Sequence, residues 1–167
     1  MGGCERRTSE RGGARMSGCS KAAIDASLYR SALMKMIVDG EPDFFVTLAF
    51  NRDVTLEDAK ADAHHLFARI DGVTIGRSWY KRPAMRTSYI GLAENLDSNL
   101  HLHLAVRVHP SHHAVFEATA RTLWAGCVRS GSIDVQSIYD ASGLAAYMTK
   151  QITPAECDRI TFSPFKA

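Results

Sequence analysis

The stretch from Leu100 to Val108, LHLHLAVRV, constrains the fold of this 167-residue chain more than any other segment. Apolar side chains occupy every second position, which is the period of a β-strand that buries one face. A helix would spread the same leucines and valines around its axis. We therefore expect a strand that buries these apolar side chains and places His101 and His103 together on its other face.

Other segments carry equally readable patterns. Helical spacing of apolar residues marks four segments, which are 27–40, 55–70, 116–127 and 142–152. Strand-like runs mark three more, which are 44–50, 87–94 and 132–138. The polar turn NLDSN joins the second of these runs to the histidine strand and predicts an antiparallel hairpin. Thr55 and Asp58 resemble a capping box at the start of the second helix.

From residue 44 onward these elements follow the order β-α-β-β-α-β-α. This order predicts an α+β domain in which helices cover one face of an antiparallel sheet, the split βαβ arrangement of ferredoxin-like and RRM-like domains. The other sheet face is then free for a ligand. We expect one domain over residues 26–167. Residues 1–25 are rich in Gly, Ser and Arg with almost nothing apolar, so we expect a disordered basic arm there.

Composition narrows the functional classes only in part. The formal net charge of +2 neither indicates nor excludes a nucleic-acid partner. The four cysteines form no CxxC pair, which argues against a zinc ribbon or a disulfide framework and suits a reducing cytoplasm. No apolar run approaches the roughly 20 residues that span a bilayer. We therefore expect a cytoplasmic protein with no membrane partner.

The two strand histidines form half of a candidate metal site. Their Cα atoms should lie about 6.5 Å apart, close enough for both imidazoles to reach one cation. Glu94 ends the preceding strand across the short turn and is the expected third ligand, while Asp97 is a weaker substitute. Imidazoles with a carboxylate suit Mn²⁺ or Mg²⁺, although Zn²⁺ or Co²⁺ can also enter such a site.

The last predicted helix carries a second group of polar side chains. Tyr147, Lys150 and Gln151 stand at positions i, i+3 and i+4, so they share one flank of the helix. A tyrosine hydroxyl has a reference pKa of about 10 and needs a nearby cation or base to act as a nucleophile near neutral pH. Lys150 or a bound metal can supply that help.

The segment GRSWYKRPAMR interleaves basic and aromatic residues. Arg and Lys contact phosphates, and aromatic rings stack on unpaired bases. The predicted DNA-binding residues are Arg77, Trp79, Tyr80, Lys81, Arg82 and Arg86. The adjacent pairs His64-His65 and His112-His113 cannot point one way from a helix or a strand, so we interpret them as surface histidines.

Taken in order, FFVTLAF, LHLHLAV and YMTK resemble the three motifs of the HUH endonucleases, most closely the initiators of rolling-circle replication. The resemblance covers residues 43–152. It implies that His101, His103 and Glu94 bind a divalent metal. It further implies that Tyr147, assisted by Lys150, attacks a single-stranded DNA phosphodiester and forms a 5′-phosphotyrosine. The implied partners are a single-stranded or hairpin DNA origin and a separately supplied helicase, because the chain has no G-x-x-x-x-G-K motif.

Two alternatives stay open at this point. In single-tyrosine transposases of the same superfamily, a glutamine one helical turn after the tyrosine can bind the metal, and Gln151 matches it. A non-catalytic module that binds single-stranded nucleic acid could use the same sheet with Trp79 and Tyr80.

Overall fold

The computed structural model describes residues 25–163, so the basic arm expected over residues 1–25 lies outside the described residues except for Asp25. The helices are α1 (Ala26–Asp39), α2 (Leu56–Thr74), α3 (His113–Cys127) and α4 (Ala141–Thr149). The strands are β1 (Phe44–Ala49), β2 (Ser88–Glu94), β3 (His101–Arg107), β4 (Ser132–Ser137) and β5 (Ile160–Phe162). The chain is therefore α+β, as predicted.

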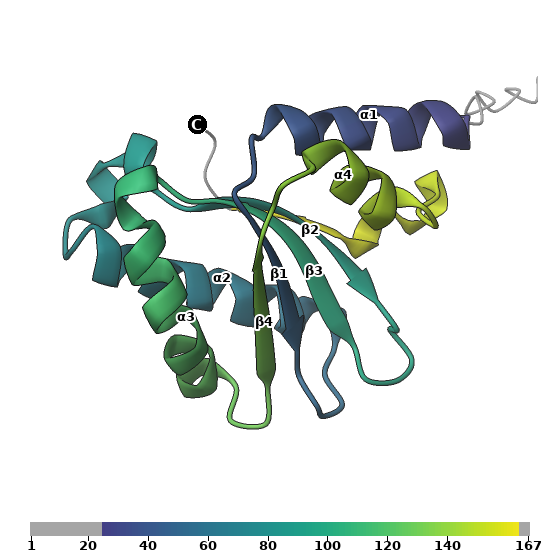
Figure 1. The fold of residues 1–167 in the computed structure, drawn as a ribbon. Coiled ribbons are helices and arrows are strands. Elements are labelled where there is room, and N and C mark those ends of the chain that lie inside the picture. Colours follow the sequence, from purple (N-terminus) through teal and green to yellow (C-terminus); the bar gives the residue numbers. More distant parts are fainter. Residues whose placement is uncertain (1–24, 164–167) are drawn as a thin grey trace, which may run out of the picture.

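The strands form one five-stranded sheet in the order β4-β1-β3-β2-β5, and every neighbouring pair is antiparallel (Figure 1). The predicted hairpin of β2 and β3 is confirmed. The sequence did not predict β5, whose three residues are too few to show a period. It pairs with the outer edge of β2 and extends the sheet by one short strand.

Helices cover both faces of the sheet, so the prediction that they lie on one face alone is wrong (Figure 1). The larger core lies between the sheet and the helices α2 and α3. On the opposite face, α1 and α4 pack over Leu92 and Ala105, which are each 4 % exposed. These apolar side chains require a cover, because exposed apolar area costs free energy. The end of that face at which β2 and β3 meet their turn extends beyond the two helices (Figure 1).

The turn between β2 and β3 sets the register that matters for the site. Asn95 and Asn99 have φ angles of 54° and 52°, in the left-handed region that asparagine tolerates better than most residues. The turn that they shape places Glu94 directly opposite His101.

The sequence patterns predicted where the helices α2 and α4 begin better than where they end. The Thr55 hydroxyl accepts a hydrogen bond of 3.1 Å from the Asp58 amide and starts α2, as predicted. However, α2 continues four residues beyond the predicted end, to Thr74. Helix α4, in contrast, ends before its predicted end, at Thr149, so Lys150 and Gln151 follow the helix instead of lying within it. None of the helices described here combines the length and the apolar character needed to cross a bilayer.

Candidate metal and tyrosine site

Three predicted metal ligands meet at the end of the sheet. The Glu94 carboxylate oxygen Oε2 lies 3.6 Å from Nε2 of His101 and 3.4 Å from Nε2 of His103. One ligand atom from each residue lies within 4.8 Å of the other two. Atoms that share a cation at about 2.1 Å lie about 3.0–3.4 Å apart, so small side-chain rotations bring this group onto one ion. The three residues could therefore hold a metal ion.

Hydrogen bonding at His101 supports this interpretation. Its Nδ1 lies 3.2 Å from the backbone carbonyl oxygen of Asn99, which can only accept a hydrogen bond. Nδ1 therefore carries a proton, and in the neutral ring Nε2 presents a lone pair toward the Glu94 carboxylate. A lone pair facing a carboxylate oxygen is unfavourable unless a proton or a metal cation lies between them. The donor set thus fits a cation.

His103 is more enclosed than its neighbour. Thr47 Oγ1 lies 3.1 Å from its Nδ1, and the Phe45 ring stacks on it with centroids 5.4 Å apart and planes 18° from parallel. Burial lowers the pKa of His103, an effect that the Glu94 carboxylate opposes and the charges of His101 and Lys150 reinforce. A neutral imidazole is the form that binds metals.

Tyr147 reaches the same place from α4. Its ring centroid lies 6.2 Å from that of His103, in an edge-to-face arrangement, and its residue is 45 % exposed. Lys150 Nζ lies over the tyrosine ring, 4.4 Å from its centroid. Arg30 of α1 donates a hydrogen bond to the Lys150 carbonyl oxygen and ties the residue that follows α4 to α1. A tyrosine, an amine and the Glu94-His101-His103 group are therefore neighbours, although 44 residues separate Tyr147 from His103 in the sequence.

Gln151, the alternative third ligand, is exposed and shares a cavity with Glu94. Both residues line a small cavity that Glu156 and Arg159 also border. Arg159 pairs with Glu156 at 2.9 Å.

The predicted DNA-binding segment does not join this site. It forms two short 3-10 turns, Trp79–Lys81 and Pro83–Met85, that lead into β2 at Ser88. Glu94 ends that strand, so the length of β2, about 20 Å, separates the segment from the metal ligands. Four of the predicted residues are exposed, which are Arg77, Tyr80, Lys81 and Arg82.

Arg86 departs from its predicted role. Its side chain is 5 % exposed and its Nε lies 3.1 Å from Oδ2 of Asp71, which is itself buried. The guanidinium also lies 4.2 Å from the centre of the Trp79 ring, which is only partly exposed. Arg86 therefore stabilises the packing between α2 and β2, and its guanidinium is not on the surface for a phosphate.

Sequence reasoning missed Thr47 and Phe45. Burial of Phe44, Val46 and Leu48 places the alternate residues of β1 on the histidine face. Thr47 is the one polar residue of that strand, and this was the signal that could have identified it. His112 was expected on the surface and is instead buried, because the turn Pro110–His112 directs it inward.

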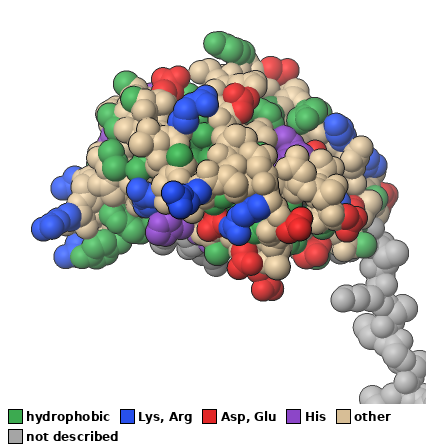
Figure 2. All heavy atoms as spheres, turned by 90° about the horizontal axis from the view of Figure 1, so that it is seen from below, with side chains coloured by type: hydrophobic (Ala, Val, Ile, Leu, Met, Phe, Trp, Pro, Cys, Tyr) green, Lys and Arg blue, Asp and Glu red, His purple; other side chains and the backbone are tan. Residues whose placement is uncertain are grey.

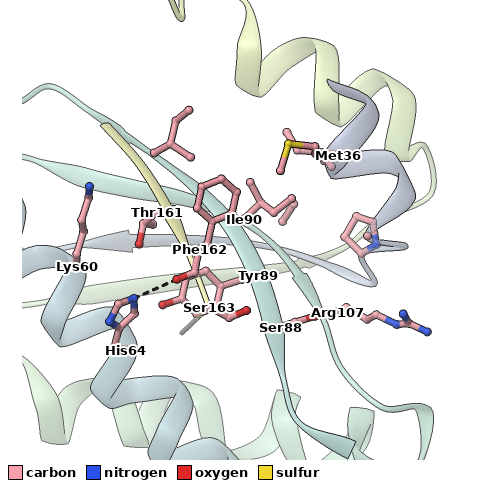
Figure 3. A pocket seen from close by; sticks show the side chains of 15 residues that line it. Met36, Lys60, His64, Ser88, Tyr89, Ile90, Arg107, Thr161, Phe162 and Ser163 are labelled. Atoms are coloured by element: carbon pink, nitrogen blue, oxygen red, sulfur yellow. Dashed lines mark hydrogen bonds between the residues drawn. The ribbon is translucent and has the colours of Figure 1, made fainter. Parts of the chain in front are cut away.

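The surface of the molecule carries charges of both signs and one groove apart from the candidate metal ligands. Viewed from the side of the strand-connecting turns, both basic and acidic side chains appear on this face of the molecule (Figure 2). A separate groove of about 800 Å³ lies at the β2–β5 edge, between α1 and α2 (Figure 3). Lys60 and His64 flank it, and the His64 ring bonds the carbonyl oxygen of Phe162 (Figure 3). None of the candidate metal ligands is among the described residues that line it.

No protein-family model, curated protein or solved structure matches this chain.

Proposed function

We propose that this protein is a metal-dependent endonuclease that nicks and rejoins single-stranded DNA through Tyr147, as an HUH initiator of rolling-circle replication does. One observation carries the proposal. A tyrosine from α4 lies edge-on to His103 with ring centroids 6.2 Å apart, beside a carboxylate and two imidazoles whose ligand atoms converge. A nucleophile next to a cation site is the arrangement that phosphodiester transesterification requires.

The reaction balances without water. Tyr147 Oη attacks the phosphorus, a phosphorus–tyrosine oxygen bond forms, and the bond to the 3′ oxygen breaks. The tyrosine hydroxyl loses its proton and the departing 3′ oxygen gains one. Lys150 supplies positive charge beside the tyrosine, where negative charge develops. Because the phosphodiester energy is kept in the 5′-phosphotyrosine, a 3′-hydroxyl can reverse the reaction and rejoin the strand.

The proposed cofactor is Mn²⁺ or Mg²⁺, held by Glu94, His101 and His103. When bound, such a cation supplies Lewis-acid polarisation of the scissile phosphate. A carboxylate beside two imidazoles is a donor set that these ions accept. The strand order β4-β1-β3-β2, with crossover helices α2 and α3, supports a split βαβ fold within the proposal. The proposal also includes a cytoplasmic setting, a single-stranded or hairpin origin as substrate and a helicase from another chain.

Covalent adduct formation tests the proposal. The full chain is incubated with Mn²⁺ and a randomised pool of single-stranded oligonucleotides, and denaturing gels reveal protein that carries DNA. We expect an adduct with wild type and none with Tyr147→Phe. Tyr139→Phe is the matched control, because Tyr139 is 98 % exposed and precedes α4. If Tyr147→Phe forms as much adduct as wild type, the nucleophile is assigned wrongly.

Metal-binding and DNA-binding measurements on variants of the protein distinguish two other functions. A transposase of the same chemistry is favoured by the cavity that Gln151 shares with Glu94, and it predicts that Gln151 contributes more to metal binding than Glu94 does. A non-catalytic binding module predicts DNA affinity that neither a chelator nor His101→Ala changes. The exposed basic residues before β2 are the observation that favours this second alternative.

A further inference from the structure

Strand β1 encloses the His103 ring on two sides. Thr47 lies directly opposite His103 in the β1–β3 register, and its hydroxyl oxygen is 3.1 Å from Nδ1. Phe45, two residues earlier on the same face, stacks on the imidazole with ring centroids 5.4 Å apart. These contacts restrict both the tilt of the ring and its rotation about the Cβ–Cγ bond, so Nε2 is directed toward Glu94.

The two histidines have different partners at Nδ1. The partner of His101 is the carbonyl oxygen of Asn99, which belongs to the same turn. The partner of His103 is a side chain from a strand more than 50 residues away in the sequence. A hydroxyl oxygen can accept a hydrogen bond from Nδ1–H just as the carbonyl does. With the Nδ1 proton held in this way, the Nε2 lone pair faces the position where the candidate ligands converge.

We propose that Thr47 is a positioning residue of the metal site. Its hydroxyl orients His103 and keeps the ring proton on Nδ1, so that both imidazoles present Nε2 to the same ion. This inference rests on the metal site of the proposed function, but it does not require that the protein cleave DNA.

The test measures metal binding without DNA. Mn²⁺ is titrated into the full-length protein and the free ion is followed by electron paramagnetic resonance. Thr47→Val keeps the branched shape and removes the hydroxyl, and it should weaken Mn²⁺ binding by about 10–100-fold, the usual cost of losing an outer partner of a metal-bound histidine. Thr47→Ser keeps a hydroxyl and should bind within about threefold of wild type. Thr74→Val is the matched control, because the Thr74 hydroxyl bonds the Ile70 carbonyl within α2.

A second measurement separates positioning from a merely structural role. With the protein saturated by Mg²⁺, the ¹⁵N chemical shifts of the His103 ring report which nitrogen carries the proton. Wild type and Thr47→Ser should have the proton on Nδ1 and protect it from exchange with water, whereas in Thr47→Val this proton has no acceptor and should exchange faster at an unchanged melting temperature. If Thr47→Val fails to fold, wild type alone decides, since a proton on Nε2 in the Mg²⁺-saturated protein overturns the inference.

The outcomes distinguish this inference from the proposed nuclease. If a folded Thr47→Val variant binds Mn²⁺ as tightly as wild type, the role of Thr47 is overturned and the nuclease proposal is untouched. If the predicted affinities are found but Tyr147 forms no DNA adduct, the nuclease proposal fails and Thr47 keeps its role. If wild type binds no Mn²⁺ at millimolar concentration, both are overturned.

Discussion

Histidines gather at both ends of β3, but among residues 25–163 only those at one end share a carboxylate in a group of three possible metal ligands. The metal-site histidines, His101 and His103, begin the strand, and their rings lie 4.7 Å apart with both Nε2 atoms near Glu94. The distal histidines, His109, His112 and His113, follow its other end. Within residues 25–163, the Glu94-His101-His103 group is the one set of three metal-binding side chains whose ligand atoms meet.

Each distal histidine is engaged by its own neighbours. His109 bonds the Ser111 hydroxyl at 2.8 Å, and His113 Nε2 bonds the Val108 carbonyl oxygen at 2.9 Å. His112 is buried. Residues that alternate on a strand share a face, whereas adjacent residues in a turn point apart. The alternation along β3 together with the carboxylate opposite it, more than the number of histidines, therefore determines which of them can share a metal ion.

The strongest predicted change is a loss of folding stability on replacing a buried carboxylate near the distal histidines. Asp71 is buried, pairs with Arg86 and accepts a 2.9 Å hydrogen bond from the Thr87 amide. Asp71→Ala leaves the Arg86 charge buried without this carboxylate and should lower the free energy of unfolding by about 3–5 kcal/mol, measured by urea denaturation. Mn²⁺ affinity of the folded variant should stay at the wild-type value.

The control for that prediction is a pair at the surface. Asp62→Ala removes the 3.6 Å contact with Arg52, and both side chains are partly exposed. It should cost less than about 1 kcal/mol. Loss of Mn²⁺ binding in a folded Asp71→Ala variant would show that the two ends of β3 are coupled. It would contradict the expectation that they act independently.

The second prediction contrasts one histidine from each end. His103→Ala removes a direct metal ligand and should weaken Mn²⁺ binding by about 100-fold or more, beyond the 10–100-fold typical of outer partners. His113→Ala should leave the affinity within about threefold, because His113 bonds Val108 and Asp43 instead. Calorimetric titration of the two variants measures both affinities. Equal losses would mean that the histidines of the hairpin have no special role.

The third prediction concerns the third ligand. Glu94→Gln retains an oxygen donor but removes the negative charge, so it should weaken Mn²⁺ binding about tenfold, which is about 1.4 kcal/mol. Gln151→Ala should weaken it by less than about threefold, since Gln151 follows the end of α4 and is not in the group whose ligand atoms converge. The reverse order of the two effects in the same titration would favour the transposase interpretation.

Part of this site could be predicted because the relevant relations are local. Strand alternation placed His101 and His103 on one face, and a short turn placed Glu94 next to them. Thr47 was missed because its position depends on the register between β1 and β3, which are far apart in the sequence and share no turn.

The wrong predictions have a common physical origin. Amphipathic periodicity shows that a helix has an apolar side but not which face of a sheet that side covers, so α1 and α4 were misplaced. A charged residue in a loop is usually solvated, but Arg86 is buried because a buried carboxylate from α2 pairs with it. In both cases the missing information is a contact between distant segments.

The smallest expected effect is a pH dependence at the distal end. Burial lowers the pKa of His112, an effect that His109 reinforces and Asp71 opposes. The unfolded chain therefore binds a proton at a higher pH than the folded protein does. The stability that neutral His112 contributes is complete above the unfolded value of about 6.5, and it is lost as the pH falls through the lower folded pKa.

Replacing His112 by a side chain that cannot titrate measures this contribution. Urea denaturation near pH 7.5 and near pH 5.5 should show that His112→Gln loses less stability on acidification than wild type does. His65→Gln is the control, because His65 is exposed on α2 and its removal should leave the wild-type loss unchanged. If His112→Gln loses as much stability as wild type, His112 is not a buried neutral group of the folded protein. Mn²⁺ affinity at neutral pH should be the same in all three proteins, since the distal histidines take no part in the metal site.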